Sequence, residues 1–143
     1  MIVSLHVATG AAAGHLAGSR LGALLIGPPL HVAGDRVPHQ DIASRRFEIT
    51  SGVALLAALA VRRGPFDPAT IGAAAASAPD LEHVIPWLRP RRGKLFHRRG
   101  GHGGGLPAAL QLLAAGYILG LLLGPRSSEY SLVRTPRTST SRS

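Results

Sequence analysis

The chain has 143 residues, enough for one domain, and combines a formal net charge of +9 with 45% hydrophobic residues. Aromatic residues make up only 4%, whereas glycine contributes 18 residues, a composition typical of helices that pack closely. The absence of cysteine excludes disulfides and thiolate metal sites. The basic residues are not interleaved with aromatic side chains on which bases could stack, which disfavours a nucleic-acid binder.

Basic residues are concentrated in two parts of the chain. Six of them lie between residues 89 and 99, and four more lie beyond residue 125. This segregation is typical of membrane proteins that obey the positive-inside rule, with the lipid bilayer as their partner and the 89–99 loop in the cytoplasm. No basic region follows Met1, so we expect no cleavable signal peptide.

The first apolar segment covers residues 3–26 and predicts a helix. The sequence Gly27-Pro28-Pro29 predicts its end, and a short piece over residues 30–37 follows. Glycine recurs at every fourth position of the first segment, at Gly10, Gly14 and Gly18. Such a ridge of small residues predicts that another helix approaches closely.

Three further helices are predicted downstream. Asp41 is the expected N-cap of a helix that runs to about residue 61, and Asp67 caps a second helix that ends near residue 78. The clearest span covers residues 106–123, about 27 Å of helix at 1.5 Å per residue, close to the thickness of a hydrocarbon core. Gln111 is its one strongly polar residue, and we expect it to face other helices.

These elements predict an all-α fold, an integral membrane bundle of about four hydrophobic helices joined by polar loops rich in His and Asp. We expect residues 1–125 to form the helical membrane domain. Residues 126–143 are rich in Ser, Thr and Arg without an apolar period, so we expect a disordered basic tail there.

The sequence has only seven acidic residues and seven histidines, yet it places several of them together. The first group consists of His31, Asp35, His39 and Asp41. Imidazole and carboxylate groups at this spacing could hold a divalent metal, with one carboxylate orienting an imidazole. The alternative is a polar helix end with an ordinary His–Asp hydrogen bond.

Two more groups follow. Asp80, Glu82 and His83 come directly after an apolar helix, and either metal binding or helix capping accounts for them. His97, Arg98 and His102 lie in a glycine-rich basic loop, where arginine could hold an anion or merely set topology. His6 stands alone in an apolar segment, and a histidine in that position is more typical of packing than of ligation.

The motifs resemble those of the bacterial membrane-bound metal-dependent hydrolases. The similar stretches are Pro79-Asp80-Leu81-Glu82-His83, then His97-Arg98-x-x-x-His102, and an early His6 in an apolar helix. In that family a Pro-Asp-Ile/Leu-Asp/Glu-His motif precedes a His-Arg-Gly-x-Thr-His-Ser motif. Gly101 and Gly103 stand here where the family has Thr and Ser. The resemblance implies a metal-binding, multi-pass helical protein of the bacterial inner (cytoplasmic) membrane.

We therefore expect metal-assisted hydrolysis of an anionic or lipid-like substrate, with zinc as the metal because zinc accepts histidine together with carboxylate. Glu82 is the expected proton acceptor, and Arg98 is expected to hold the substrate. The expected ligands are Asp80, His83, His97 and His102, with His31, Asp35, His39 and Asp41 as a second set. The alternative is a small non-catalytic membrane protein whose polar clusters cap and link helices. A metal site requires the two stretches to meet in the folded bundle.

Overall fold

The computed structural model describes residues 1–81, residue 85 and residues 104–124, and these form an all-α fold, as predicted. No strand occurs among the described residues, where His39 and Leu106 form only an isolated bridge. The helical elements are α1 (Val3–Ala17), α2 (Arg20–Arg36), α3 (Arg45–Arg63), α4 (Pro68–Ser77), the short 3-10 helix η1 (Ala78–Asp80) and α6 (Ala108–Leu123).

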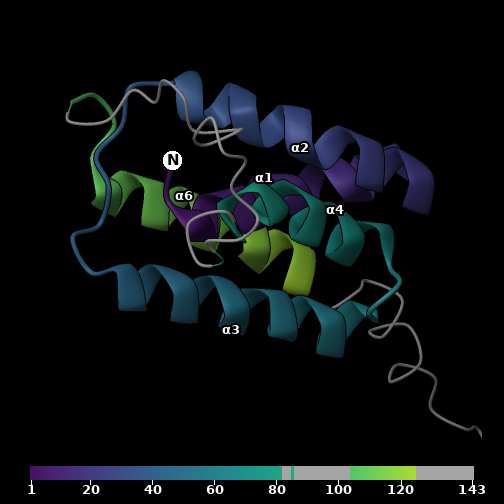
Figure 1. Cartoon of the computed structure of the whole chain (residues 1–143). Helices are drawn as coiled ribbons and strands as arrows, with labels where there is room; N and C mark the ends of the chain where they lie inside the picture. The colour runs from purple at the N-terminus through teal and green to yellow at the C-terminus, as the bar shows by residue number, and fades with distance from the viewer. Residues whose placement is uncertain (82–84, 86–103, 125–143) are drawn as a thin grey trace, which may run out of the picture.

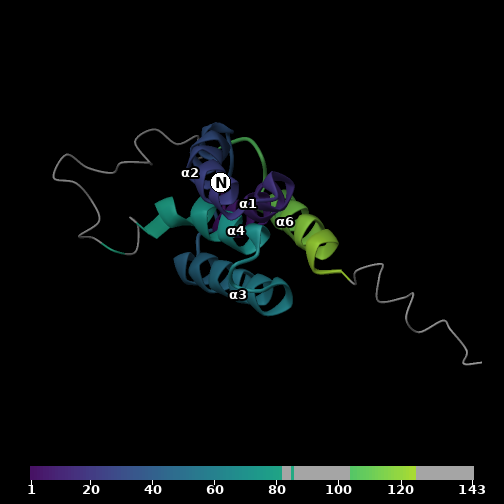
Figure 2. The same cartoon turned by 90° about the vertical axis from the view of Figure 1, so that its right-hand side faces the viewer.

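Helix α1 is the centre of the bundle and contacts α2, α3, α4 and α6 (Figures 1 and 2). Helices α2 and α4 run opposite to α1, α3 and α6 (Figure 1). The beginnings of three helices and the ends of two others therefore gather at one end of the bundle. Side chains that are far apart in the sequence meet there.

Glycines allow α1 and α4 to touch through their backbones. A Cβ atom added at Gly10 would collide with the carbonyl oxygen of Gly72, and one added at Gly14 would collide with that of Pro68. The ridge predicted from the sequence thus makes the expected close approach at two of its three positions. Because η1 continues directly from α4, this contact also places Asp80 relative to α1.

The third glycine of the ridge ends α1 instead. Gly18 adopts a left-handed conformation with φ of 64°, which glycine tolerates without steric cost. Ser19 then caps α2, its hydroxyl accepting a hydrogen bond from the N–H of Gly22 at 3.1 Å. The prediction of one helix over residues 3–26 is therefore wrong, because a cap and a left-handed turn divide it.

The prediction of a break at Pro28 and Pro29 is also wrong, because α2 continues through both prolines to Arg36. The piece predicted over residues 30–37 is the last part of that helix. Proline removes a backbone donor and clashes with the preceding turn, so packing must hold the helix together. Helix α2 packs along α4, and Gly27 lies directly against Ala75.

Helix α3 begins later than predicted. Ser44 is its N-cap and accepts a hydrogen bond from the N–H of Phe47 at 3.3 Å, whereas Asp41 lies within 3.1 Å of His39. The cap of α4 is confirmed, because the carboxylate of Asp67 accepts a hydrogen bond from the N–H of Ala69 at 2.9 Å. Pro68 occupies the first turn of α4, where its missing donor costs least.

The span predicted over residues 106–123 is helical, as α6, which begins after Pro107, but its expected crossing of a membrane gains no support. Gln111 is fully buried and faces other parts of the bundle, as expected. Its side-chain oxygen accepts a hydrogen bond from the N–H of Ile2 at 3.0 Å, and its nitrogen donates to the carbonyl oxygen of Gln40 at 2.8 Å. This amide ties the N-terminus and the loop after α2 to α6.

Among the helices of the described residues, none combines the length and the hydropathy needed to cross a membrane. Helix α6 is apolar but has 16 residues, and α3 has 19 residues but carries arginines at both ends. The prediction of an integral membrane bundle gains no support from these helices. The tail predicted over residues 126–143 lies outside the described residues.

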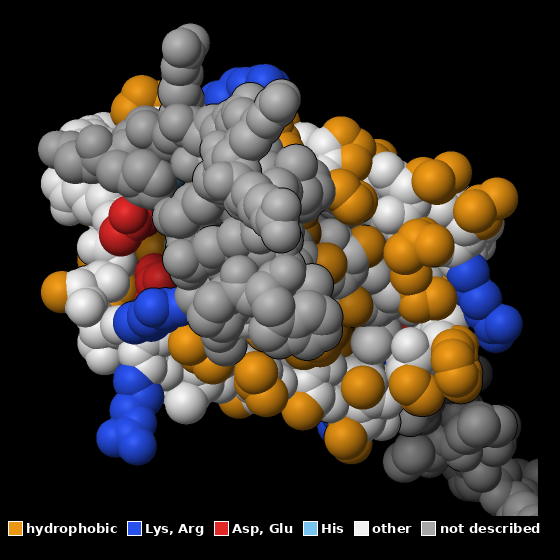
Figure 3. Space-filling view, viewed as in Figure 1, with side chains coloured by type: hydrophobic (Ala, Val, Ile, Leu, Met, Phe, Trp, Pro, Cys, Tyr) orange, Lys and Arg blue, Asp and Glu red, His pale blue; other side chains and the backbone are white. Residues whose placement is uncertain are grey.

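On one face of the bundle, hydrophobic and acidic side chains lie in different regions. Figure 3 shows hydrophobic side chains spread over the right half of this face, whereas the acidic side chains visible there lie at the left. In the same view, the left is the end where α1, α3 and α6 begin and where α2 and α4 end. The acidic side chains visible on this face thus lie toward one end of the molecule.

Candidate metal centre

Three side chains from three elements converge in the interior of this end. They are His6 of α1, His31 of α2 and Asp80 of η1. One potential ligand atom from each lies within 4.8 Å of the others. Both imidazoles are fully buried and stack with their ring centroids 3.9 Å apart, while the Asp80 side chain is 20% exposed. The group could hold a metal ion.

The ring of His31 is fixed by a backbone contact. Its Nδ1 atom lies 2.8 Å from the carbonyl oxygen of Ala76, which can only accept, so Nδ1 donates. The Nε2 atom then lies 3.2 Å from Asp35 Oδ2 and 3.9 Å from Asp80 Oδ1. A histidine that donates from one nitrogen to a carbonyl group presents the other nitrogen as a metal ligand.

His6 is suited to ligation because it is held neutral. Burial lowers its pKa below the usual 6.5, and the hydrogen bond to Asp35 offsets only part of this effect. Its Nε2 atom lies 3.0 Å from Asp35 Oδ1, while its buried Nδ1 atom has no hydrogen-bond partner within the described part of the chain. Buried polar atoms are normally satisfied, so a neutral imidazole with an open nitrogen fits a metal ligand.

Asp35 joins the two histidines. Its Oδ1 atom faces His6 and its Oδ2 atom faces His31, at the 3.0 and 3.2 Å given above. The amino group of Met1 also donates to Oδ1 at 2.6 Å, and the residue is only 6% exposed. Asp35 Oδ1 therefore accepts a hydrogen bond from His6 Nε2 and orients that ring from a buried position, whereas His31 Nε2, as a metal ligand, has no proton to donate to Oδ2.

The remaining members of the first predicted group form a separate pair. His39 Nε2 lies 3.1 Å from Asp41 Oδ1 and also contacts the amino group of Met1. His39 Nδ1 lies 2.7 Å from the carbonyl oxygen of Val37. His39 is buried but the side chain of Asp41 is 45% exposed, and neither belongs to the three-residue group. Of the predicted second set of ligands, His31 belongs to the three-residue group and Asp35 contacts it. His39 and Asp41 lie at the border of the group.

The predicted meeting of the two stretches is observed between His31 and Asp80. The other residues predicted in the second stretch lie outside the described residues: Glu82, His83, His97, Arg98 and His102. His6 was not among the predicted ligands, because a lone histidine in an apolar segment is more typical of packing. The signal that pointed to it was its early position in the motif resemblance.

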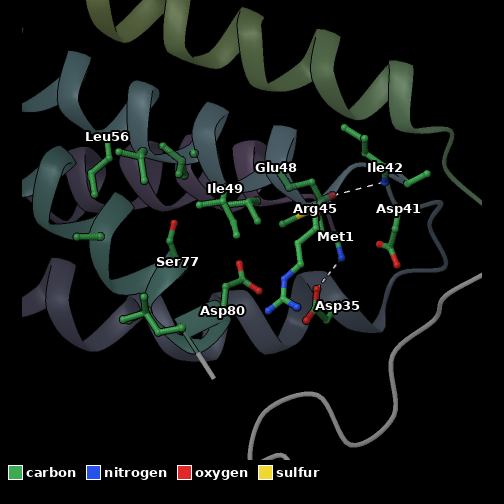
Figure 4. Close-up of a pocket in the computed structure, with 18 residues that line it drawn as sticks. Met1, Asp35, Asp41, Ile42, Arg45, Glu48, Ile49, Leu56, Ser77 and Asp80 are labelled. Carbon is green, nitrogen blue, oxygen red and sulfur yellow. Dashed lines mark hydrogen bonds and ion pairs between the residues drawn. The ribbon is translucent and has the colours of Figure 1, made fainter. Parts of the chain in front are cut away.

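A pocket of about 690 Å³ lies beside the centre, between α3 and the end of α4 (Figure 4). Asp35, Asp80 and Arg45 line its polar end, and the side chains of Ile49 and Leu56 line the rest of one wall. Glu48 is half-buried at the border, and burial raises the pKa of its carboxyl group. A cavity of this size beside convergent polar groups is typical of a small-molecule site.

Comparisons with protein-family models, with curated proteins and with solved structures find no match to this chain. The resemblance of the motifs to the membrane-bound metal-dependent hydrolases stays a prediction. The geometry around His6, His31 and Asp80 is therefore the basis for assigning a function.

Proposed function

We propose that the protein is a metal-dependent hydrolase of the kind its motifs resemble, with zinc as its metal. The observation that carries this proposal is the buried group of His6, His31 and Asp80 beside a pocket of about 690 Å³. Two imidazoles with one carboxylate match the donor set of catalytic zinc sites that retain an open position. When bound there, the metal supplies Lewis acidity and lowers the pKa of a coordinated water molecule.

The protein's own residues would prepare this chemistry. The contact of His31 with Ala76 fixes which nitrogen faces the site, and Asp35 orients the ring of His6. Glu82 follows Asp80 by two residues, and we propose it as the proton acceptor. Arg98 is proposed as a contact to the substrate. His83, His97 and His102 stay proposed ligands from the motifs, as alternatives to members of this group rather than additions to it, because zinc must keep an open position.

We also propose a position at the bilayer of the bacterial inner membrane. Large hydrophobic side chains are exposed on two helices, namely Leu21, Leu24 and Leu25 of α2 and Leu110, Leu113, Tyr117 and Leu121 of α6. Extended apolar surface is typical of membrane or protein contact sites. We expect the protein to stay with the membrane pellet after a carbonate wash. Recovery in the wash supernatant would contradict this part of the proposal.

Metal analysis of the purified chain tests the centre. We expect His6→Ala, His31→Ala and Asp80→Asn each to lower bound zinc by at least about tenfold. His15→Ala is the matched control, because His15 lies on the same helix as His6 but is exposed and contacts Arg63. It should leave the zinc content unchanged. Equal zinc content in all four variants would favour the non-catalytic alternative.

Hydrolysis itself is tested with a panel of simple phosphate and carboxylate esters. Activity on at least one ester should disappear after chelation and return when zinc is added. Activity that persists in the fully chelated protein would contradict a metal-dependent mechanism. Hydrolysis that survives His31→Ala at the parent rate would show that another site is responsible.

A further inference from the structure

The pocket beside the metal centre follows one face of α3. Arg45, Ile49, Gly52 and Leu56 all line it, and their spacing of three or four residues places them in a row along the helix. Between Arg45 and Leu56 this row extends about 16 Å at 1.5 Å per residue. The pocket is therefore elongated, and its two ends differ in chemistry (Figure 4).

Charged groups lie at the end near the metal centre. Figure 4 shows the guanidinium group of Arg45 directed between Asp80 and Asp35. No ion pair joins Arg45 to another residue within the ranges that the structure describes. The planar guanidinium group binds phosphate oxygens by paired hydrogen bonds. Four carboxylates also line the pocket, those of Asp35, Asp41, Glu48 and Asp80. A divalent metal ion together with Arg45 offsets their charge, and only the metal-bound site is therefore suited to an anionic group.

The rest of the pocket is apolar. Val3 and Val7 of α1 line it together with Val53 of α3 and Ala74 of α4. Ala74 is exposed, so this part of the pocket is open to the surface. Burying an alkyl chain against these aliphatic side chains favours binding, because apolar surface is removed from water. A polar ligand would lose its hydration there without gaining hydrogen bonds.

We propose that the substrate is a phosphate ester carrying a single long alkyl chain, with its phosphate at Arg45 and its chain along α3 toward Leu56. This inference rests on the proposed hydrolase function. A phosphate ester is favoured over a fatty carboxylate because its anionic phosphate is both the group that Arg45 binds and the group that water attacks in hydrolysis. The recognised group and the reacting group then coincide beside His6, His31 and Asp80.

The reaction is a simple hydrolysis. The oxygen of water bonds to phosphorus while the bond between phosphorus and the alkyl oxygen breaks. One proton of water passes to the departing alkyl oxygen, which gives the long-chain alcohol. The other hydrogen remains in the hydrogen phosphate product. No oxidant, reductant or further reactant is needed.

Binding without turnover tests the substrate class independently of catalysis. The full-length chain, kept in solution with an amphipathic polymer instead of detergent, is titrated calorimetrically with dodecyl phosphonate, which cannot be hydrolysed at the phosphorus–carbon bond. We expect binding at least about tenfold tighter than that of inorganic phosphate, because only the phosphonate fills the apolar part. Dodecyltrimethylammonium has the same chain with a cationic head and should bind at least about tenfold more weakly than the phosphonate.

Variants separate the two ends of the pocket. Arg45→Gln should weaken phosphonate binding about tenfold, whereas Arg46→Gln should not, because Arg46 is the neighbouring residue but does not line the pocket. Ala74→Trp should fill the apolar part and remove the preference for dodecyl phosphonate over butyl phosphonate. Ala57→Trp is its control, because Ala57 is exposed on α3 and does not line the pocket.

The outcomes distinguish this inference from the function on which it rests. Equal binding of dodecyl phosphonate and inorganic phosphate would overturn the chain-binding role of the pocket. Tighter binding of the cationic amphiphile would overturn the role of Arg45. If either occurs while zinc content and ester hydrolysis remain as proposed, the substrate class is wrong but the hydrolase assignment stands. If the unmodified protein binds no zinc, the proposed function itself is wrong.

Discussion

The imidazole of His31 donates a hydrogen bond to the carbonyl oxygen of Ala76 at 2.8 Å, which joins α2 to α4 inside the bundle. Ala76 lies one helical turn before Asp80 in the chain. The contact therefore fixes the histidine against the same segment that supplies the carboxylate. One hydrogen bond thus orients the ring of one proposed ligand and holds it against the helix that leads to the other.

Loss of this contact should reduce stability even without metal. We expect His31→Ala to lower the free energy of unfolding by about 2 kcal/mol, because it removes a buried hydrogen bond and leaves a cavity. The measurement is chemical unfolding in the presence of a chelator. The exposed variant His15→Ala should stay within about 0.5 kcal/mol of the parent. Similar losses in both variants would show that the His31 contact contributes no special stability.

Asp35→Asn tests the residue that orients the imidazole of His6. The amide keeps the shape of the carboxylate, but it has no negative charge to attract the Met1 amine and only one of its two polar atoms can accept a hydrogen bond. We expect zinc affinity to fall about 10- to 100-fold, the usual effect of losing a partner of a metal ligand. Competition with a chromogenic chelator measures this change. Asp41→Asn, at the more exposed pair with His39, should change affinity much less.

Gly10→Ala should destabilise the bundle, because the new methyl group would collide with the backbone of α4. We expect a loss of about 1–3 kcal/mol from overpacking. Gly116 is the matched control in α6, since a Cβ atom added there meets nothing within 4 Å. Gly116→Ala should be neutral or stabilise by up to about 1 kcal/mol through helix propensity. Thermal unfolding of both variants checks the contrast.

Glu48→Gln should stabilise the protein at neutral pH. Burial raises the pKa of Glu48 above 4.5, so the folded state binds its proton more tightly than the unfolded state. The stability that this proton confers is present below pH 4.5 and is lost as the pH rises through the folded pKa. We expect the variant to melt up to about 3 °C higher at pH 7, an effect kept small by partial exposure, and no higher at pH 4. An equal increase at both pH values would rule out the carboxyl charge as the cause.

The sequence predicted those features of the fold that depend on local chemistry. Asp67 followed by Pro68 is a strong helix start, and α4 begins there. The apolar run before Gly124 predicted α6, and its single polar residue, Gln111, indicated which side is buried. The all-α class follows from the same apolar runs. Each of these signals acts within a few residues.

One of the errors arose where distant contacts decide the outcome. Pro28 and Pro29 would end an isolated helix, but α2 is held against α4 on both sides of them. Gly18 has the same spacing as Gly10 and Gly14, yet it faces no helix and instead turns the chain. The first outcome depends on the position of α4, which follows the prolines by dozens of residues in the chain. The second is a local helix end, formed by Gly18 and the Ser19 cap, that the spacing of the glycines concealed.

The sequence predicted which residue types form the candidate site, but not which individual residues belong to it. Histidines and acids grouped near Asp35 and Asp80 indicated a metal site, and His31 and Asp80 do meet. His6 was not assigned, because its one signal was its early position in the motif resemblance and a single histidine in an apolar segment is more typical of packing. His39 and Asp41 belonged to the same pattern but pair with each other at the border. Spacing alone does not distinguish a ligand from its neighbour.

The ligands of the proposed centre come from α1, α2 and η1, which meet only when the chain is folded. An unfolded chain cannot offer the same group, so any ion held there binds the native state selectively. Zinc at a hundred times its dissociation constant would add about 2.7 kcal/mol to the free energy of unfolding. In a cell starved of zinc, the apo protein would open more often and be degraded faster. Metal supply would thereby govern the abundance of this protein as well as its proposed activity.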